Sequence, residues 1–182
     1  MNKLKKRLLN LSIGEFAATC VFIYIYISSS LITIGIANLI AFLYLVFILI
    51  QGSMYWFYKY RLIVKREQPN PKAVKLLSNL RKLNMVIALA IIVTIPIIKS
   101  NYKDLLIAIG LVLFGIIEYI NYYWYQLSYG ASGFNIKILL DKGLQKSSIA
   151  KTIDKKSQDA SLVLCELNNL LNSILGLTSM LY

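Results

Sequence analysis

Two acidic residues within apolar stretches are the side chains of this chain best suited to chemistry. Glu15 lies in the first apolar stretch and Glu118 in the last, and the chain contains no histidine. A charged side chain at the centre of a membrane costs ~2.5–3.5 kcal/mol on insertion scales, so acidic residues in such segments are functional candidates. Two carboxylates that approach closely resist joint ionisation. Such a pair could bind a cation or relay a proton.

Other polar residues recur at the same expected depth in all four apolar stretches. Asn121 and Tyr125 follow Glu118 at roughly helical spacing, Gln51 ends the second stretch and Asn84 begins the third. We therefore predict one intramembrane polar cluster that contains Glu15, Gln51, Asn84, Glu118, Asn121 and Tyr125. Polar groups also join helices in lipid, at ~0.6–2 kcal/mol each. Structural pairing is therefore an alternative to an ion or proton site, as is a site for a lipid or small ligand.

Enzymatic chemistry is not expected. The absence of histidine removes the commonest metal ligand and the commonest general base. The sequence contains no phosphate-binding glycine loop, metal-ligand cluster or nucleophile motif. Cys20 and Cys165 are expected on opposite sides of the first membrane interface, so they should not form a structural disulfide. We predict no enzyme activity, no metal and no cofactor.

The elements that position these residues are four apolar stretches, at residues 8–27, 31–50, 83–98 and 105–125. A helix of about 20 apolar residues spans a hydrocarbon core of about 30 Å. Helices are expected because lipid offers no partner to an unpaired backbone amide. The sequence thus predicts an all-α polytopic membrane protein with four transmembrane helices and a cytoplasmic helical C-terminal tail.

The distribution of basic residues predicts the orientation. All but two of the 20 lysines and arginines lie in the N-terminal flank, between the second and third stretches, or in the tail. The two exceptions are Lys99 and Lys103. Basic residues near spans are retained in the cytoplasm. Both termini should therefore lie on the cytoplasmic side of the bacterial inner (cytoplasmic) membrane. Attraction to its anionic cytoplasmic leaflet accounts for the net charge of +12 without nucleic-acid binding.

The chain divides into a transmembrane domain, residues 1–130, and a tail, residues 131–182. Ser28 to Ser30 should join the first two spans in a tight hairpin. A basic link, residues 59–82, should join the second and third spans. Its prolines prevent the second helix from continuing. A new helix can start at Pro71, and its basic amphipathic segment should lie along the lipid headgroups.

The end of the tail carries apolar residues in alternating steps of three and four. This seam consists of Leu164, Leu167, Leu171, Ile174 and Leu181, with the polar Thr178 among them. The spacing is that of a short heptad pattern. It predicts a helix that packs on the bundle or the membrane surface, or that mediates self-association or binding to a membrane-protein partner.

Two short motifs carry a resemblance. The segment 118–123, continued by 126–129, resembles the end of the last span in small uncharacterised bacterial four-helix membrane proteins. The segment 51–56 is similar to the end of their second span. The resemblance covers about the first 150 residues and implies a four-helix membrane domain. It implies no activity.

These observations predict a non-enzymatic integral protein of the bacterial cytoplasmic membrane. Its role would be that of a partner-binding, regulatory or protective component, of the kind that confers stress resistance or immunity. The alternative is a small ion- or proton-coupled transporter that uses Glu15 and Glu118.

Overall fold

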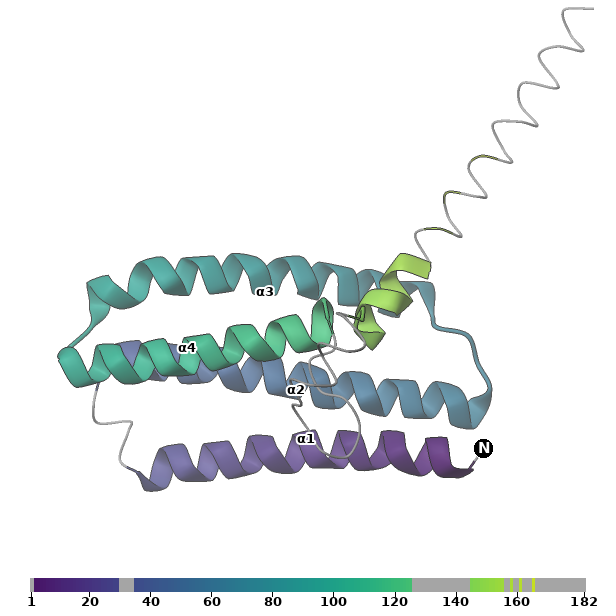
Figure 1. Cartoon of the computed structure of the whole chain (residues 1–182), viewed down its shortest axis with the longest axis horizontal. Coiled ribbons are helices and arrows are strands. Elements are labelled where there is room, and N and C mark those ends of the chain that lie inside the picture. The colour runs from purple at the N-terminus through teal and green to yellow at the C-terminus, as the bar shows by residue number, and fades with distance from the viewer. Residues whose placement is uncertain are drawn as a thin grey trace, which may run out of the picture.

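A computed structural model describes residues 2–29, 35–125 and 145–155, with isolated positions at 158, 161 and 165. Within these residues the chain is all-helical, as predicted. The four long helices are α1 (Asn2–Ser28), α2 (Ile36–Lys65), α3 (Pro71–Ile98) and α4 (Tyr102–Tyr123). A shorter helix covers residues 148–155 (Figure 1).

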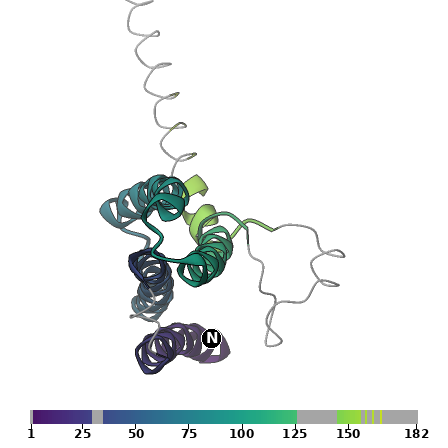
Figure 2. The ribbon, with the colours of Figure 1, turned by 90° about the vertical axis from the view of Figure 1, so that its left-hand side faces the viewer.

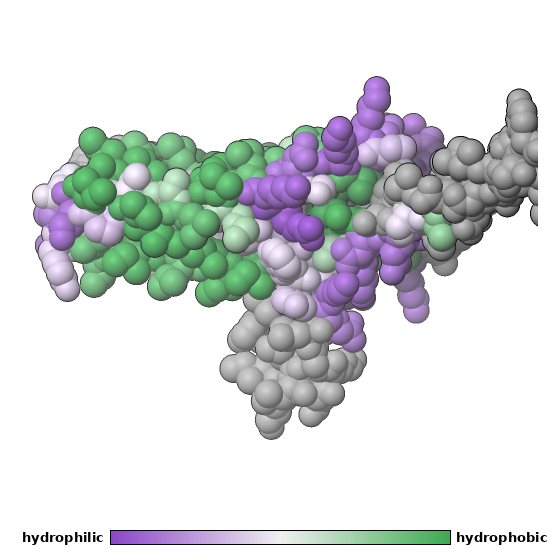
Figure 3. All heavy atoms as spheres, turned by 90° about the horizontal axis from the view of Figure 1, so that it is seen from above, coloured by the Kyte–Doolittle hydropathy of each residue, from purple (hydrophilic) through white to green (hydrophobic). Residues whose placement is uncertain are grey.

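Each long helix is long and apolar enough to cross a membrane. Even α4, with 22 residues, reaches about 33 Å at 1.5 Å per residue. Large apolar side chains point away from the other helices, among them Val93, Ile97 and Leu106. Figure 3 shows hydrophobic surface over most of the length of the helices, with most hydrophilic residues toward one end. Four such helices indicate a multi-pass membrane protein.

The four helices run alternately up and down, so their connections fall at two ends (Figure 1). One end holds the start of α1, the α2–α3 connection and the short helix 148–155. We call it the basic end, because most of the described lysines and arginines lie there. The α1–α2 and α3–α4 connections lie at the opposite end.

The predicted basic link is mostly helix. α2 continues to Lys65, and only residues 66–70 separate it from α3. Arg66 ends α2 in the left-handed conformation, at φ 58°. The side chain of Asn70 accepts a hydrogen bond from the amide of Lys72, 2.9 Å away, and Pro71 is the first helical residue, where its missing N–H costs nothing. The segment expected along the headgroups therefore forms the first three turns of α3, in line with the span.

The start of α2 differs from the predicted start of the second span. α1 ends at Ser28 as expected, but α2 begins at Ile36, five residues after the predicted start of the second span. Residues 30–34 lie outside the described part of the chain. The third span, in contrast, ends at the predicted Ile98, and Pro96 remains inside α3.

α2 is the central helix. In its most apolar 18-residue window 61% of the residues are buried, against 17% in that of α1. α1 packs along one side of α2, and α3 and α4 lie on the other (Figure 2). Gly52 and Gly115 allow close contact of α2 with α4: a Cβ at Gly52 would lie 2.5 Å from Cζ of Tyr122, and one at Gly115 would lie 2.9 Å from Cε1 of Tyr44. Small residues serve this purpose in membrane helix pairs.

Candidate functional site

The two glutamates of the apolar stretches interact with one tyrosine. The hydroxyl of Tyr122, on α4, donates a hydrogen bond to Oε2 of Glu15, on α1, at 2.5 Å. Glu118 interacts with the same hydroxyl and accepts a hydrogen bond from Nδ2 of Asn121 at 3.4 Å. Both glutamates are half-buried. A tyrosine hydroxyl between two carboxylates offers one proton to two acceptors, an arrangement that suits proton sharing or cation binding.

Small residues of α2 position this group. The ring of Tyr122 lies directly over Gly52, where any larger residue would displace it. On the next residue, the hydroxyl of Ser53 donates to the carbonyl of Ser12 at 3.0 Å, and the hydroxyl of Ser12 donates to the carbonyl of Ser53 at 3.1 Å. This reciprocal pair holds α1 against α2 one turn before Glu15. The carboxylate of Glu15 can therefore reach α4 past the glycine.

A second polar group lies between α2, α3 and α4. The side-chain amides of Gln51 and Asn84 exchange two hydrogen bonds, of 3.2 and 2.7 Å. The hydroxyl of Tyr123 donates to Oε1 of Gln51 at 2.6 Å. All three side chains are buried, and Asn84 and Tyr123 have no exposed surface. These mutual hydrogen bonds remove much of the cost of burying polar groups.

The predicted single cluster is thus divided into two. Glu15, Glu118 and Asn121 surround Tyr122, whereas Gln51 and Asn84 pair with Tyr123. Neighbouring residues of a helix point in directions about 100° apart, so adjacent tyrosines serve different neighbours. Tyr125 belongs to neither group: it follows the end of α4, is 39% exposed and forms an isolated backbone bridge with Lys146.

A cavity of about 190 Å3 lies beside Glu15. Its walls come from α1, α2, the end of α4 and the short helix, and combine one carboxylate, one guanidinium, polar side chains and apolar residues. The lining residues are Leu4, Arg7, Leu8, Leu11, Glu15, Tyr55, Trp56, Asn121, Tyr122, Ser148 and Ile149. The tail therefore contributes to the wall of the cavity next to the intramembrane carboxylate.

The tail is fastened to the bundle at the basic end. The hydroxyl of Tyr55 donates to Oγ of Ser148 at 2.9 Å, and Lys59 donates to the same oxygen. The amide of Ser147 donates to the carbonyl of Trp124 at 2.9 Å. Ile149 is 1% exposed and belongs to the main apolar core. Polar and apolar contacts thus both fix residues 147–149.

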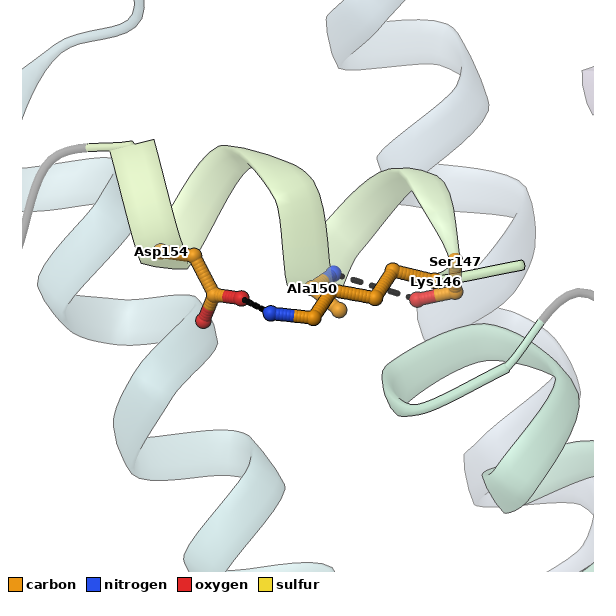
Figure 4. Close-up of polar contacts among 4 residues, drawn as sticks. All are labelled: Lys146, Ser147, Ala150 and Asp154. Atoms are coloured by element: carbon orange, nitrogen blue, oxygen red, sulfur yellow. Dashed lines mark hydrogen bonds and ion pairs between the residues drawn. The ribbon is translucent and has the colours of Figure 1, made fainter. Parts of the chain in front are cut away.

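The short helix has its own cap and ion pair. The amide of Ala150 donates to Oγ of Ser147 at 3.1 Å, so Ser147 caps the start of the helix (Figure 4). Nζ of Lys146 and Oδ2 of Asp154 form an ion pair at 2.5 Å. The hydrogen bond to Asp154 raises the pKa of the Lys146 ammonium. Both side chains are accessible to solvent, so the ion pair adds little stability. It does keep the carboxylate of Asp154 paired with Lys146.

A buried carboxylate at the opposite end, that of Asp104, was not predicted from the sequence. Asp104, on α4, accepts hydrogen bonds from the amides of Asn38 and Ser100, each at 2.9 Å. Asn101 caps α4 by accepting from the amide of Asp104 at 2.8 Å. The spacing of Asn101 and Asp104 matches a capping box, the signal that could have identified this site. Its contact with the start of α2, however, has no sequence signature.

Two other predictions concern the tail and the cysteines. The seam Leu164, Leu167, Leu171, Ile174 and Leu181 lies outside the described residues. Cys20 and Cys165 are both exposed and unbonded. Within the described ranges, no group of three or more histidine, cysteine, aspartate or glutamate side chains could hold a metal ion.

A comparison of the chain with protein families, with curated proteins and with solved structures found no match. The four apolar helices therefore define the class, a multi-pass membrane protein.

Proposed function

We propose that this chain is a non-enzymatic component of the bacterial cytoplasmic membrane that binds a partner protein through its C-terminal tail. Both termini lie in the cytoplasm in this proposal, because basic residues gather at the end where the chain begins and the tail attaches. The observation that carries the proposal is the attachment of residues 147–153 to the bundle.

The hydrogen bonds of this segment come from α2 and from the residue after α4, and its apolar residues belong to the main core. Tyr55 and Lys59 of α2 bind Ser148, and residue 147 bonds to the residue after α4. Ile149 and Ile153 are buried in the core together with Val74 of α3. A tail held in this way leaves the bundle from a defined place, which favours a fixed geometry toward a partner.

Replacement of Ile149 by aspartate should detach the tail from the bundle. Ile149 is 1% exposed, so the substitution would remove its apolar contacts with the core and bury a carboxylate without a partner. In affinity purification from native membranes in mild detergent, we expect a stoichiometric partner with the full chain. Recovery should fall at least tenfold with Ile149→Asp and with a chain that ends at Gly130.

Ile149→Val is the matched control, because it keeps the apolar contact and should retain the partner. Recovery of the full chain alone, or only as a homo-oligomer, would contradict the proposal. Retention of the partner by the chain that ends at Gly130 would contradict it as well.

A second candidate function is cation- or proton-coupled transport. It is favoured by Glu15 and Glu118, which share the hydroxyl of Tyr122 next to the 190 Å3 cavity. Transporters commonly place ionisable groups within their spans for this purpose.

If the chain is a transporter, proteoliposomes that contain it should show proton or cation flux. Glu15→Gln and Glu118→Gln should each abolish this flux. The neutral amide cannot exchange a proton or balance a cation, although it keeps the size of the side chain. Glu67→Gln is the control, because this exposed acid pairs only weakly with Lys65, at 3.9 Å. Equal flux with wild-type protein and protein-free vesicles would exclude this function.

A further inference from the structure

A second, larger cavity at the basic end gathers positive charge, with no carboxylate among the described residues that line it. It encloses about 660 Å3 between the end of α2, the start of α3 and the short helix 148–155. Its polar walls include three lysines and two hydroxyl groups, namely Lys59, Lys151, Lys155, Ser148 and Thr152. Glu15 and Tyr122 line the first cavity and are not among the lining residues of this one, although Ser148 borders both.

The three lysines converge because two helices meet there. Lys59 projects from α2, is half-buried and donates to Ser148. Lys151 and Lys155 are four residues apart, so both lie on one face of the short helix. The Lys59 ammonium lies within range of electrostatic repulsion from Lys151. Folding of the tail onto the bundle therefore brings like charges together.

The described acidic residues at this end are committed elsewhere. Asp154 pairs with Lys146, and Glu67 lines a neighbouring cavity and pairs with Lys65. Among the described residues that line the 660 Å3 cavity, none is acidic. The half-buried ammonium of Lys59 and the exposed ammonium groups of Lys151 and Lys155 together attract an anion that lowers their repulsion.

We propose that this cavity binds a phosphate group, carried either by a lipid headgroup or by a soluble phosphate. Three ammonium groups can balance the negative charge of a phosphate. The hydroxyl of Ser148, which accepts from Tyr55 and Lys59, can donate its own proton to a phosphate oxygen. The hydroxyl of Thr152 instead donates to the carbonyl of Ser148. The position of the cavity, where two membrane-crossing helices end, places it at headgroup level. The proposal is independent of partner binding by the rest of the tail.

The test compares two probes on the purified full-length chain. Native mass spectrometry would compare the number of bound phosphatidylglycerol molecules with that of phosphatidylcholine. Thermal unfolding would be compared in inorganic phosphate and in chloride at equal ionic strength. In the triple variant Lys59→Gln, Lys151→Gln, Lys155→Gln, affinity for the binding probe should fall at least tenfold. If the variant loses affinity for phosphatidylglycerol, the phosphate belongs to a lipid headgroup. If it loses affinity for inorganic phosphate, the phosphate belongs to a soluble ligand.

The matched control removes the same charge from exposed positions at the same end. It is the triple variant Lys72→Gln, Lys75→Gln, Lys82→Gln. These lysines are all exposed on α3, and their replacement should lower affinity for the probe less than twofold. If the first triple variant fails to fold, Lys151→Gln alone should still weaken binding several-fold, because this side chain is exposed. Equal loss in both triple variants, or no binding of either probe, would overturn the proposal.

Discussion

Replacement of Asp104 by alanine is expected to lower the free energy of unfolding by about 2–4 kcal/mol. The carboxylate is fully buried and accepts hydrogen bonds from the amides of Asn38 and Ser100. The buried amide of Asn38, left without an acceptor, costs about 1–3 kcal/mol, whereas the amide of the exposed Ser100 can bind water instead. Loss of cap interactions at the starts of α2 and α4 adds about 1 kcal/mol.

The same carboxylate joins the two connections at the opposite end of the bundle. A Cβ at Gly35, directly before α2, would collide with the carboxyl group of Asp104, so the glycine permits this close approach. Next to it, Tyr26 of α1 donates to the side chain of Asn38 and stacks on Phe42 with ring centroids 3.8 Å apart. Asp104 therefore connects α4 to the α1–α2 pair.

Unfolding of the detergent-solubilised protein by sodium dodecyl sulfate, followed by circular dichroism, would measure this effect. Asp104→Asn should have a smaller effect, because one oxygen acceptor remains. Lys103→Ala is the control, because this exposed neighbour should change stability by less than about 0.5 kcal/mol. A loss below 1 kcal/mol for Asp104→Ala would show that the carboxylate does not join these helices.

Replacement of Gln51 by leucine is expected to cost about 2–5 kcal/mol. Its side chain takes part in three interhelical hydrogen bonds, two with Asn84 and one from Tyr123. Such bonds average ~0.6 kcal/mol in membrane proteins and reach ~1.7 kcal/mol. The substitution also leaves the buried amide of Asn84 unpaired, so the cost should lie above the average.

A double-mutant cycle separates pairing from packing. Asn84→Leu alone should cost about 1–3 kcal/mol, and the double variant Gln51→Leu, Asn84→Leu should cost less than the sum by about 1–3 kcal/mol. Asn79→Leu is the control, because Asn79 is exposed on the same helix and should show no coupling to Gln51. Additive losses in the first cycle would mean that the amide pair contributes no specific stability.

The positions of the helices could largely be predicted from the sequence. Four apolar stretches of near-spanning length predict four helices whatever their packing, because transfer into lipid sums over consecutive residues. The start of α3 followed from Pro71, whose effect on the backbone is local. The start of α2 was not predicted, because apolar residues from Leu31 onward gave no local signal that the helix begins at Ile36.

The candidate site could be predicted only in part. Glu15 and Glu118 stood out because charges in apolar stretches are costly wherever the helices pack. Their shared partner Tyr122 depends on Gly52, which lies 70 residues earlier on another helix. The separate pairing of Gln51 with Asn84 likewise depends on the direction in which each helix face points.

The sequence by itself determined the number of apolar helices, their alternating course and the gathering of basic residues, because these follow from local composition and chain order. Only the tertiary structure decided that Asp104 joins α4 to α2, that the polar residues form two groups and that the tail packs beside Lys59. Such contacts join residues up to 107 positions apart, as with Glu15 and Tyr122. They depend on the rotation and depth of each helix against its neighbours, which hydropathy does not specify.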